Sequence, residues 1–264
     1  MPVGARNAGE FVEGKGATAR ELTTRLPGAR VEFLHGALLN PLLGEDHIEQ
    51  ILGRSSLPSA LIQQIAAQMR WLARYEVKRA IVAHGDAPLT LKLNLVHFLR
   101  WKDLARITAE RRTVPPLKRA AETLLRCRIE QMALGERIAL AHVASPGVIP
   151  ALLDDPSPEV LSALLRNGKV TEENVLTLVS GERTSAAALS AVGSCARWAS
   201  RHTVMMALVR NARTPTSVTL RFLGSLSGKD LSEVLASPHA PRLVKATVRQ
   251  ILRAAKEIPK CKVH

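Results

Sequence analysis

Basic side chains gather at two places in this chain, with spacings typical of a surface that binds anions. One set lies within residues 111–119. The other runs from 242 to 256 in steps of three or four, which places it on one stripe of a helix. The members are Arg111, Arg112, Lys118, Arg119, Arg242, Lys245, Arg249, Arg253 and Lys256. Cations at this density suffice to neutralise several phosphates of a nucleic acid. The alternative is a solvated outer face, which the terminal helix of a repeat protein needs.

Two tryptophans occur in the same local pattern, each followed by an arginine three residues later. These are Trp71 with Arg74 and Trp198 with Arg201. One interpretation is an aromatic platform beside a cation, able to stack a nucleic-acid base. The other is a large side chain that fills a gap between helices near its arginine. Because the pattern recurs, we favour packing.

Lys102-Asp103 and Lys229-Asp230 also recur. A carboxylate can serve in catalysis, but an aspartate that begins a helix complements its positive N-terminal end, and we favour that role. The motifs GxSxG, GxxxxGK[ST], HExxH and GxGxxG are absent. The scattered histidines and the cysteines Cys127, Cys195 and Cys261 lack metal-ligand spacing. We therefore expect no catalytic residue, no cofactor and no metal.

The composition favours close-packed helices. Of 264 residues 46% are hydrophobic and only 3% aromatic, with the apolar content carried by Leu, Ala, Val and Ile. The net charge of +14 fits an anionic partner, namely nucleic acid, an acidic protein or a membrane surface, although an Arg-rich surface without a partner is an equal alternative. No apolar run is long enough to span a bilayer, and no signal peptide is evident. Three distant cysteines favour a reducing, cytoplasmic location.

The chain repeats itself with a period of 127 residues. Residues 38–125 recur as residues 165–251, so that Arg70-Trp71 matches Arg197-Trp198, and Pro88 matches Pro215. Apolar positions at helical spacing predict sixteen short helices. They are expected at 31–39, 44–52, 57–68, 72–83, 88–99, 101–109, 115–132, 134–143, 146–153, 158–166, 171–179, 184–193, 199–210, 215–226, 228–236 and 240–257. Thr171 is expected to cap one of them with Asn174, and Leu243, Ala246, Thr247, Ile251 and Ala254 to form the apolar face of the last.

Short helices with tight connections bury their apolar faces by stacking in pairs. We therefore predict an all-α fold, a right-handed α-solenoid of stacked helix pairs with an internal tandem duplication. Residues 1–30 are expected to be a flexible arm. Residues 31–264 are expected to form one solenoid, with duplicated blocks at 31–127 and 158–254 joined by helical residues 128–157.

The segment Leu208–Pro215, with Asn211 and Thr214-Pro215, resembles the Ala-xx-Asn-xx-Thr-Pro turn of leucine-rich-repeat-variant and HEAT-like helical repeats. Residues 82–88 and 165–171 are weaker copies. The resemblance covers most of residues 31–257 and implies a general binding scaffold without a particular reaction. The cysteine cluster that some variant-repeat proteins use for an iron–sulfur centre is absent, so no metal is implied.

Three functions follow as hypotheses. We favour a non-catalytic scaffold that binds a protein partner. The alternative is a nucleic-acid-binding repeat protein that uses the basic helices. The least favoured is an enzyme similar to HEAT-like alkylpurine DNA glycosylases, because that family's catalytic motif matches no position in this sequence.

Overall fold

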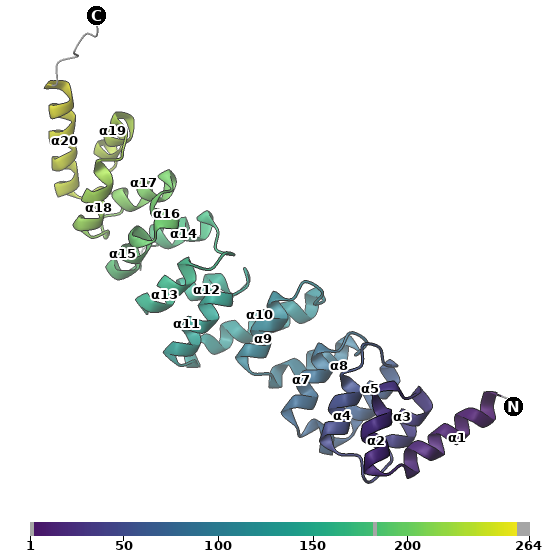
Figure 1. The fold of residues 1–264 in the computed structure, drawn as a ribbon. Helices are drawn as coiled ribbons and strands as arrows, with labels where there is room; N and C mark the ends of the chain where they lie inside the picture. The colour runs from purple at the N-terminus through teal and green to yellow at the C-terminus, as the bar shows by residue number, and fades with distance from the viewer. Residues whose placement is uncertain (1–2, 182–183, 258–264) are drawn as a thin grey trace, which may run out of the picture. The chain divides into compact units, whose positions relative to one another are not determined.

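The fold is entirely helical wherever it is described. A computed structural model describes residues 3–181 and 184–257. Over these ranges the chain forms short helices joined by tight turns and contains no strand (Figure 1). The predicted all-α class is confirmed.

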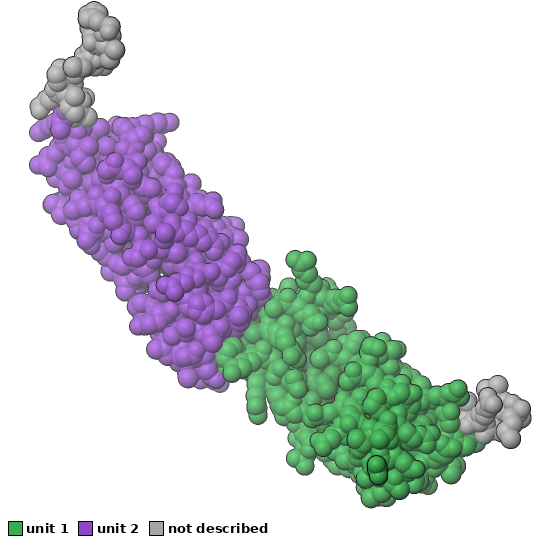
Figure 2. All heavy atoms as spheres, viewed as in Figure 1, with its two compact units in different colours: residues 1–125 green, residues 126–264 purple. Residues whose placement is uncertain are grey.

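The chain divides into two compact units, residues 1–125 and 126–264 (Figure 2). The predicted blocks at 31–127 and 158–254 fall almost entirely in the first and the second unit, and each unit is described by itself. The first unit contains α1 (Val3–Gly16), α2 (Ala19–Arg25), η1 (Leu26–Gly28), α3 (Val31–Ala37), α4 (Glu45–Leu52), α5 (Ser59–Ala67), α6 (Met69–Leu72), α7 (Tyr75–Ala83), α8 (Leu89–Leu95), η2 (Val96–Phe98) and α9 (Trp101–Ala109). The boundary lies within α10 (Pro115–Arg128).

The second unit is also built from short helices. It contains η3 (Ile129–Gln131), α11 (Leu134–Val143), α12 (Ile149–Leu153), α13 (Pro158–Leu165), α14 (Glu172–Ser180), α15 (Ala186–Ser194), α16 (Ala196–Ala199), α17 (His202–Arg210), α18 (Thr216–Leu223), α19 (Gly228–Ala236) and α20 (Arg242–Glu257). Two series of helices stack within this unit: α11 packs on α13 and α13 on α15, while α14 packs on α17 and α17 on α19. Each helix thus buries one face against the next helix of its series.

All sixteen predicted helices are present, with ends that differ by at most four residues. The prediction missed α6 and α16, the short helices that carry Trp71 and Trp198. The Thr171 cap is confirmed, because its hydroxyl accepts the N–H of Asn174 and the Asn174 side chain accepts the N–H of Thr171.

The predicted flexible arm at residues 1–30 is wrong. This segment forms α1 and α2, and Leu22 and Leu26 are fully buried. Helix α1 packs on α3 through two glycines that allow the backbones to touch. A Cβ on Gly14 would collide with the Phe33 carbonyl oxygen, and one on Gly36 with that of Phe11. The prediction treated glycine in a polar segment as a sign of flexibility. Gly14 and Gly36 instead permit close packing of the two helices.

The predicted apolar face of the last helix is also wrong. Val244 and Val248 are fully buried, whereas Leu243 is 58% exposed. Helix α20 packs on α18 and α19. Val244, Val248 and Ile251 follow one another at steps of four and three residues and therefore lie on one face of the helix. Leu243 directly precedes Val244 and lies off that face.

A matched pair of substitutions in α1 tests the close contact with α3. We expect Gly14→Ala to lower the melting temperature and to expose α1 to limited proteolysis, because the new methyl group meets the backbone of α3. Gly9→Ala has open space around it and should stabilise the same helix by about 0.5–1 kcal/mol, the usual gain of alanine over glycine. Stabilisation by both substitutions would contradict the contact.

Candidate functional site

A polar side chain closes the turn after several helices, buried at Asn40, His84 and Asn167 and partly exposed at Asn211. At each place its acceptor atom takes the backbone N–H two residues later, and its donor reaches a carbonyl oxygen at or just after the end of an earlier helix. We call these side chains helix-end latches. In the turns that follow α3 and α13 the latches are asparagines: Asn40 is 1% exposed and Asn167 is 4% exposed. The donated bonds are Asn40 Nδ2 to the carbonyls of Gly14 (3.1 Å) and Ala17 (2.8 Å), and Asn167 Nδ2 to those of Ala141 (2.8 Å) and Ala144 (3.1 Å).

Two further latches follow α7 and α17. His84 Nε2 donates to the Arg54 carbonyl at 2.9 Å, and Asn211 Nδ2 donates to the Val179 carbonyl at 2.6 Å. Their acceptor atoms take the N–H of Asp86 and of Arg213. Carbonyls at helix ends lack helical partners, so each latch satisfies a group that would otherwise be left open. Asn211 lies in the turn that carries the family resemblance.

The tryptophans are buried, so the platform interpretation is wrong and the packing interpretation holds. Trp71 is 6% exposed and Trp198 is 1% exposed. The preceding arginine, rather than the following one, lies over each ring: Arg70 is 4.2 Å from the centre of Trp71 and Arg197 is 4.3 Å from that of Trp198. Both rings lie in the core, and Trp198 lies beside the Asn167 turn, where it bonds the Leu165 carbonyl.

Arg74 and Arg201 serve instead in surface ion pairs. Arg74 Nε lies 3.2 Å from Glu45, and Arg201 Nη1 lies 3.1 Å from Glu172. Both arginine side chains are more than half exposed. Exposed pairs of this kind contribute at most about 1 kcal/mol. Neither arginine takes part in a site with the neighbouring tryptophan.

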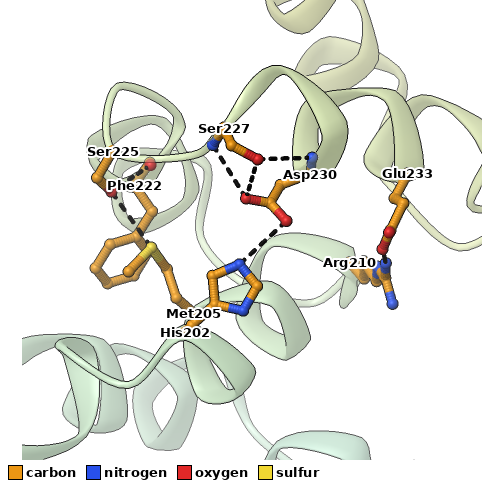
Figure 3. Close-up of polar contacts among 8 residues, drawn as sticks. All are labelled: His202, Met205, Arg210, Phe222, Ser225, Ser227, Asp230 and Glu233. Atoms are coloured by element: carbon orange, nitrogen blue, oxygen red, sulfur yellow. Dashed lines mark hydrogen bonds and ion pairs between the residues drawn. The ribbon is translucent and has the colours of Figure 1, made fainter.

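Asp103 and Asp230 stand in the first turns of α9 and α19, as the favoured interpretation requires. Asp230 accepts hydrogen bonds from the N–H and hydroxyl of Ser227, and His202 lies 3.1 Å from its other oxygen (Figure 3). The bond from the Ser227 hydroxyl, together with His202, lowers the pKa of Asp230 to about 2. Asp103 accepts a hydrogen bond from the Tyr75 hydroxyl, and burial of that hydroxyl, followed by this bond, raises the pKa of Tyr75. These carboxylates hold helices together.

The stripe on α20 is present in the structure. Arg242, Arg249 and Arg253 are exposed and Lys245 is partly exposed, on the side away from buried Val244 and Val248. No ion pair to these four cations occurs within the described residues. The backbone of Lys256 lies in α20, but its side chain lies outside the described residues.

The first basic set lies between α9 and the first turns of α10. Arg111, Arg112 and Arg119 are exposed, and Lys118 is partly exposed. This set belongs to the first unit and the α20 stripe to the second, and each is described within its own unit. The eight predicted cations whose side chains are described lie at exposed or partly exposed positions.

Each unit also carries a groove, which sequence spacing did not reveal. The groove of the first unit has a volume of about 360 Å³ and lies where α4, α7 and α9 meet. The groove of the second unit has a volume of about 650 Å³ and lies beside α14 and α17. The lining residues are Leu52, Arg54, Ser55, Arg79, Ala80, Ala83, His84, Gly85 and Arg106 in the first, and Val179, Ser180, Gly181, Ala207, Arg210, Asn211, Ala212, Arg213 and His239 in the second.

The two grooves occupy equivalent positions in the 127-residue period. Leu52 corresponds to Val179, Ala80 to Ala207, and the latch His84 to the latch Asn211. Arginines line both grooves, and several are held by carboxylates: Arg79 by Glu76, and Arg210 by Glu233, each at 2.6 Å. Figure 3 shows the Arg210–Glu233 pair bridging α17 and α19. Each groove is therefore a cationic hollow with a small apolar floor, and one of its arginines pairs with a carboxylate outside the lining.

The described residues contain no group of three or more His, Cys, Asp or Glu side chains able to hold a metal. Cys127 is exposed and Cys195 is partly exposed, while Cys261 lies outside the described residues. Within the described ranges no helix is both long and apolar enough to cross a membrane.

The two tryptophans provide a matched test of the buried contacts. Trp198 Nε1 donates to the Leu165 carbonyl at 2.9 Å, whereas Trp71 Nε1 is buried without a hydrogen-bond partner in the described residues. We expect Trp198→Phe to cost about 1 kcal/mol more in urea unfolding than Trp71→Phe, because only the first leaves a carbonyl unpaired. Equal losses would contradict the assigned bond.

No protein-family model, no curated protein and no solved structure matches this chain. A function therefore has to be argued from the residues and contacts of the chain itself. The features that bear on it are two equivalent grooves and two basic sets, one in each unit.

Proposed function

We propose that this chain is a HEAT-like helical-repeat scaffold that binds a protein partner and catalyses no reaction. As its architecture we propose a right-handed α-solenoid that arose by tandem duplication with a period of 127 residues. Contacts that recur at this interval support the duplication. Asn40 and Asn167 bind equivalent carbonyls, and the Arg74–Glu45 pair recurs as Arg201–Glu172.

The observation that carries the scaffold function is the pair of equivalent grooves. Binding sites are concave, have an apolar floor and place a few polar groups at defined positions. Both grooves have these features at the same place in their units. One arginine in each groove pairs with a carboxylate beside it, Arg79 with Glu76 and Arg210 with Glu233, an arrangement that suits the mixed charges of a protein surface.

Filling the grooves tests this proposal in the full chain. Ala83 and Ala212 are exposed and line the first and the second groove, so tryptophan at both positions should block the grooves without disturbing the core. We expect Ala83→Trp with Ala212→Trp to abolish co-purification of a stoichiometric protein partner from nuclease-treated cell extract. Exposed Ala133 lines neither groove, and Ala133→Trp should leave the partner bound.

Two results would overturn the proposal. One is a partner that survives the groove-filling variant unchanged. The other is that only nucleic acid accompanies the untreated chain and nothing remains after nuclease digestion. Circular dichroism of each variant confirms that the helices are intact.

A second candidate, nucleic-acid binding, is favoured by the α20 stripe. Arg242, Lys245, Arg249 and Arg253 extend over about 16 Å of helix, and no carboxylate of the described residues pairs with them. Because Trp71 and Trp198 are buried, their rings cannot stack on nucleic-acid bases. Binding would then rest on phosphate contacts and would be independent of sequence.

Salt dependence measures those contacts directly. Each phosphate neutralised on duplex DNA contributes about −0.9 to the slope of log K against log salt concentration. If α20 binds DNA, the double variant Arg249→Ala with Arg253→Ala should make the slope shallower by about 2 in fluorescence anisotropy. The variant Arg74→Ala with Arg201→Ala removes the same charge from ion-paired positions and should leave the slope unchanged. Equal changes in both variants would mean diffuse attraction to a basic protein.

A further inference from the structure

We infer that each groove binds an acidic peptide segment, with a carboxylate on its exposed arginine and a small apolar side chain on its floor. This inference rests on the proposed scaffold function and names the chemistry of the partner.

The floor of each groove is small and apolar. Leu52 and Val179 occupy equivalent places, as do Ala80 and Ala207. Leu52 and Val179 are nearly buried, so they offer a surface for contact but no deep hole. Volumes of about 360 and 650 Å³ suit a few residues of a peptide.

The charged side chains that line the grooves are cationic. None of the described residues lining either groove is an aspartate or a glutamate. Arg106 is 58% exposed and lies 3.8 Å from Asp103, a long separation for an ion pair. Arg213 is exposed, and no carboxylate of the described residues pairs with it. Each groove therefore offers at least one guanidinium group that can bind a carboxylate in two places.

The cationic character is kept although the residues differ. Arg106 of the first unit corresponds to Glu233 of the second, and Ala83 corresponds to Arg210. The exposed guanidinium group therefore belongs to α9 in the first unit and to the turn after α17 in the second. Glu233 now holds Arg210 at 2.6 Å, and Arg213 supplies the exposed cation.

These exposed arginines are not needed to satisfy the helix ends beside them. The Arg54 carbonyl already accepts from His84, and the Val179 carbonyl accepts from Asn211. The Leu178 carbonyl accepts from Thr184. The C-terminal end of a helix is negative and attracts cations. Here the carbonyls just named already accept hydrogen bonds from other donors. The guanidinium groups of Arg106 and Arg213 remain available to a ligand.

The neighbouring carboxylates select a peptide rather than a nucleic acid. A phosphodiester chain carries a negative charge at every nucleotide and would pass Glu76 beside the first groove and Glu233 beside the second, the acids that pair with Arg79 and Arg210. A peptide can place one carboxylate on the exposed arginine and keep uncharged residues beside those acids.

Labelled synthetic peptides test the inference with the full chain. The probe is a ten-residue peptide that alternates Glu with Ala or Val, and its control has Gln in place of every Glu. We expect fluorescence anisotropy to show at least tenfold weaker binding of the Gln peptide. The double variant Arg106→Ala with Arg213→Ala should weaken the Glu peptide by a similar factor.

Two control variants separate the grooves from net charge and from unfolding. Arg74→Ala with Arg201→Ala removes the same charge outside the grooves and should leave peptide binding unchanged. Ala83→Glu with Ala212→Glu adds a carboxylate at exposed positions and should weaken the Glu peptide while it admits a Lys peptide. Equal weakening by both arginine pairs, or equal binding of Glu and Gln peptides, would overturn the inference. Competition by duplex DNA that depends on Arg106 and Arg213 would assign the grooves to nucleic acid instead.

The outcomes also separate this inference from the scaffold proposal. If groove-filling tryptophans release the cellular partner but the Arg106 and Arg213 variant does not affect peptide binding, the scaffold stands and the acidic peptide is wrong. If the tryptophans leave the partner bound, the grooves are not its site, whatever the peptides do.

Discussion

Helices as short as these end often, and every end presents carbonyl groups that no helical N–H can reach. A buried carbonyl without a partner costs about 1–3 kcal/mol, so a chain of short helices needs a regular source of donors. The helix-end latches supply them. Asn40, His84, Asn167 and Asn211 each close a turn with one atom and bind an earlier helix end with another. A single side chain thereby ends one helix and fixes its neighbour.

The remaining packing is arranged around these turns. Arg197 donates to the carbonyls of Asn167 and Val170, and Trp198 donates to the carbonyl of Leu165, so ring and guanidinium group brace one loop from both sides. The grooves lie beside the other two latches, His84 and Asn211. Their position therefore follows from where helices must end, and their chemistry follows from the side chains that happen to border those ends.

Local signals in the sequence predicted much of the fold. Helical spacing located sixteen helices, and the Thr171–Asn174 pair was readable because capping involves residues three apart. Helices α1 and α2 were missed because glycine and polar residues suggested flexibility, while Gly14 and Gly36 in fact serve a helix crossing. The face of α20 was misjudged because Leu243 is apolar but exposed, and only its packing on α18 and α19 decides which side is buried. The grooves were out of reach, since Leu52, Ala80 and Arg106 come from three separate helices and share no motif.

The helix-end latches and the hydrogen bonds of Arg197 and Trp198 also share a short separation in the sequence. The side-chain bonds that join one helix layer to the next connect residues only 23 to 33 positions apart. That separation is about a tenth of the chain length, within the range of relative contact order found for fast-folding helical proteins. A pair of helices can therefore close its own turn soon after it leaves the ribosome, without waiting for distant parts of the chain. The spacing of these bonds allows neighbouring helices to pair locally, in whichever part of the chain folds first.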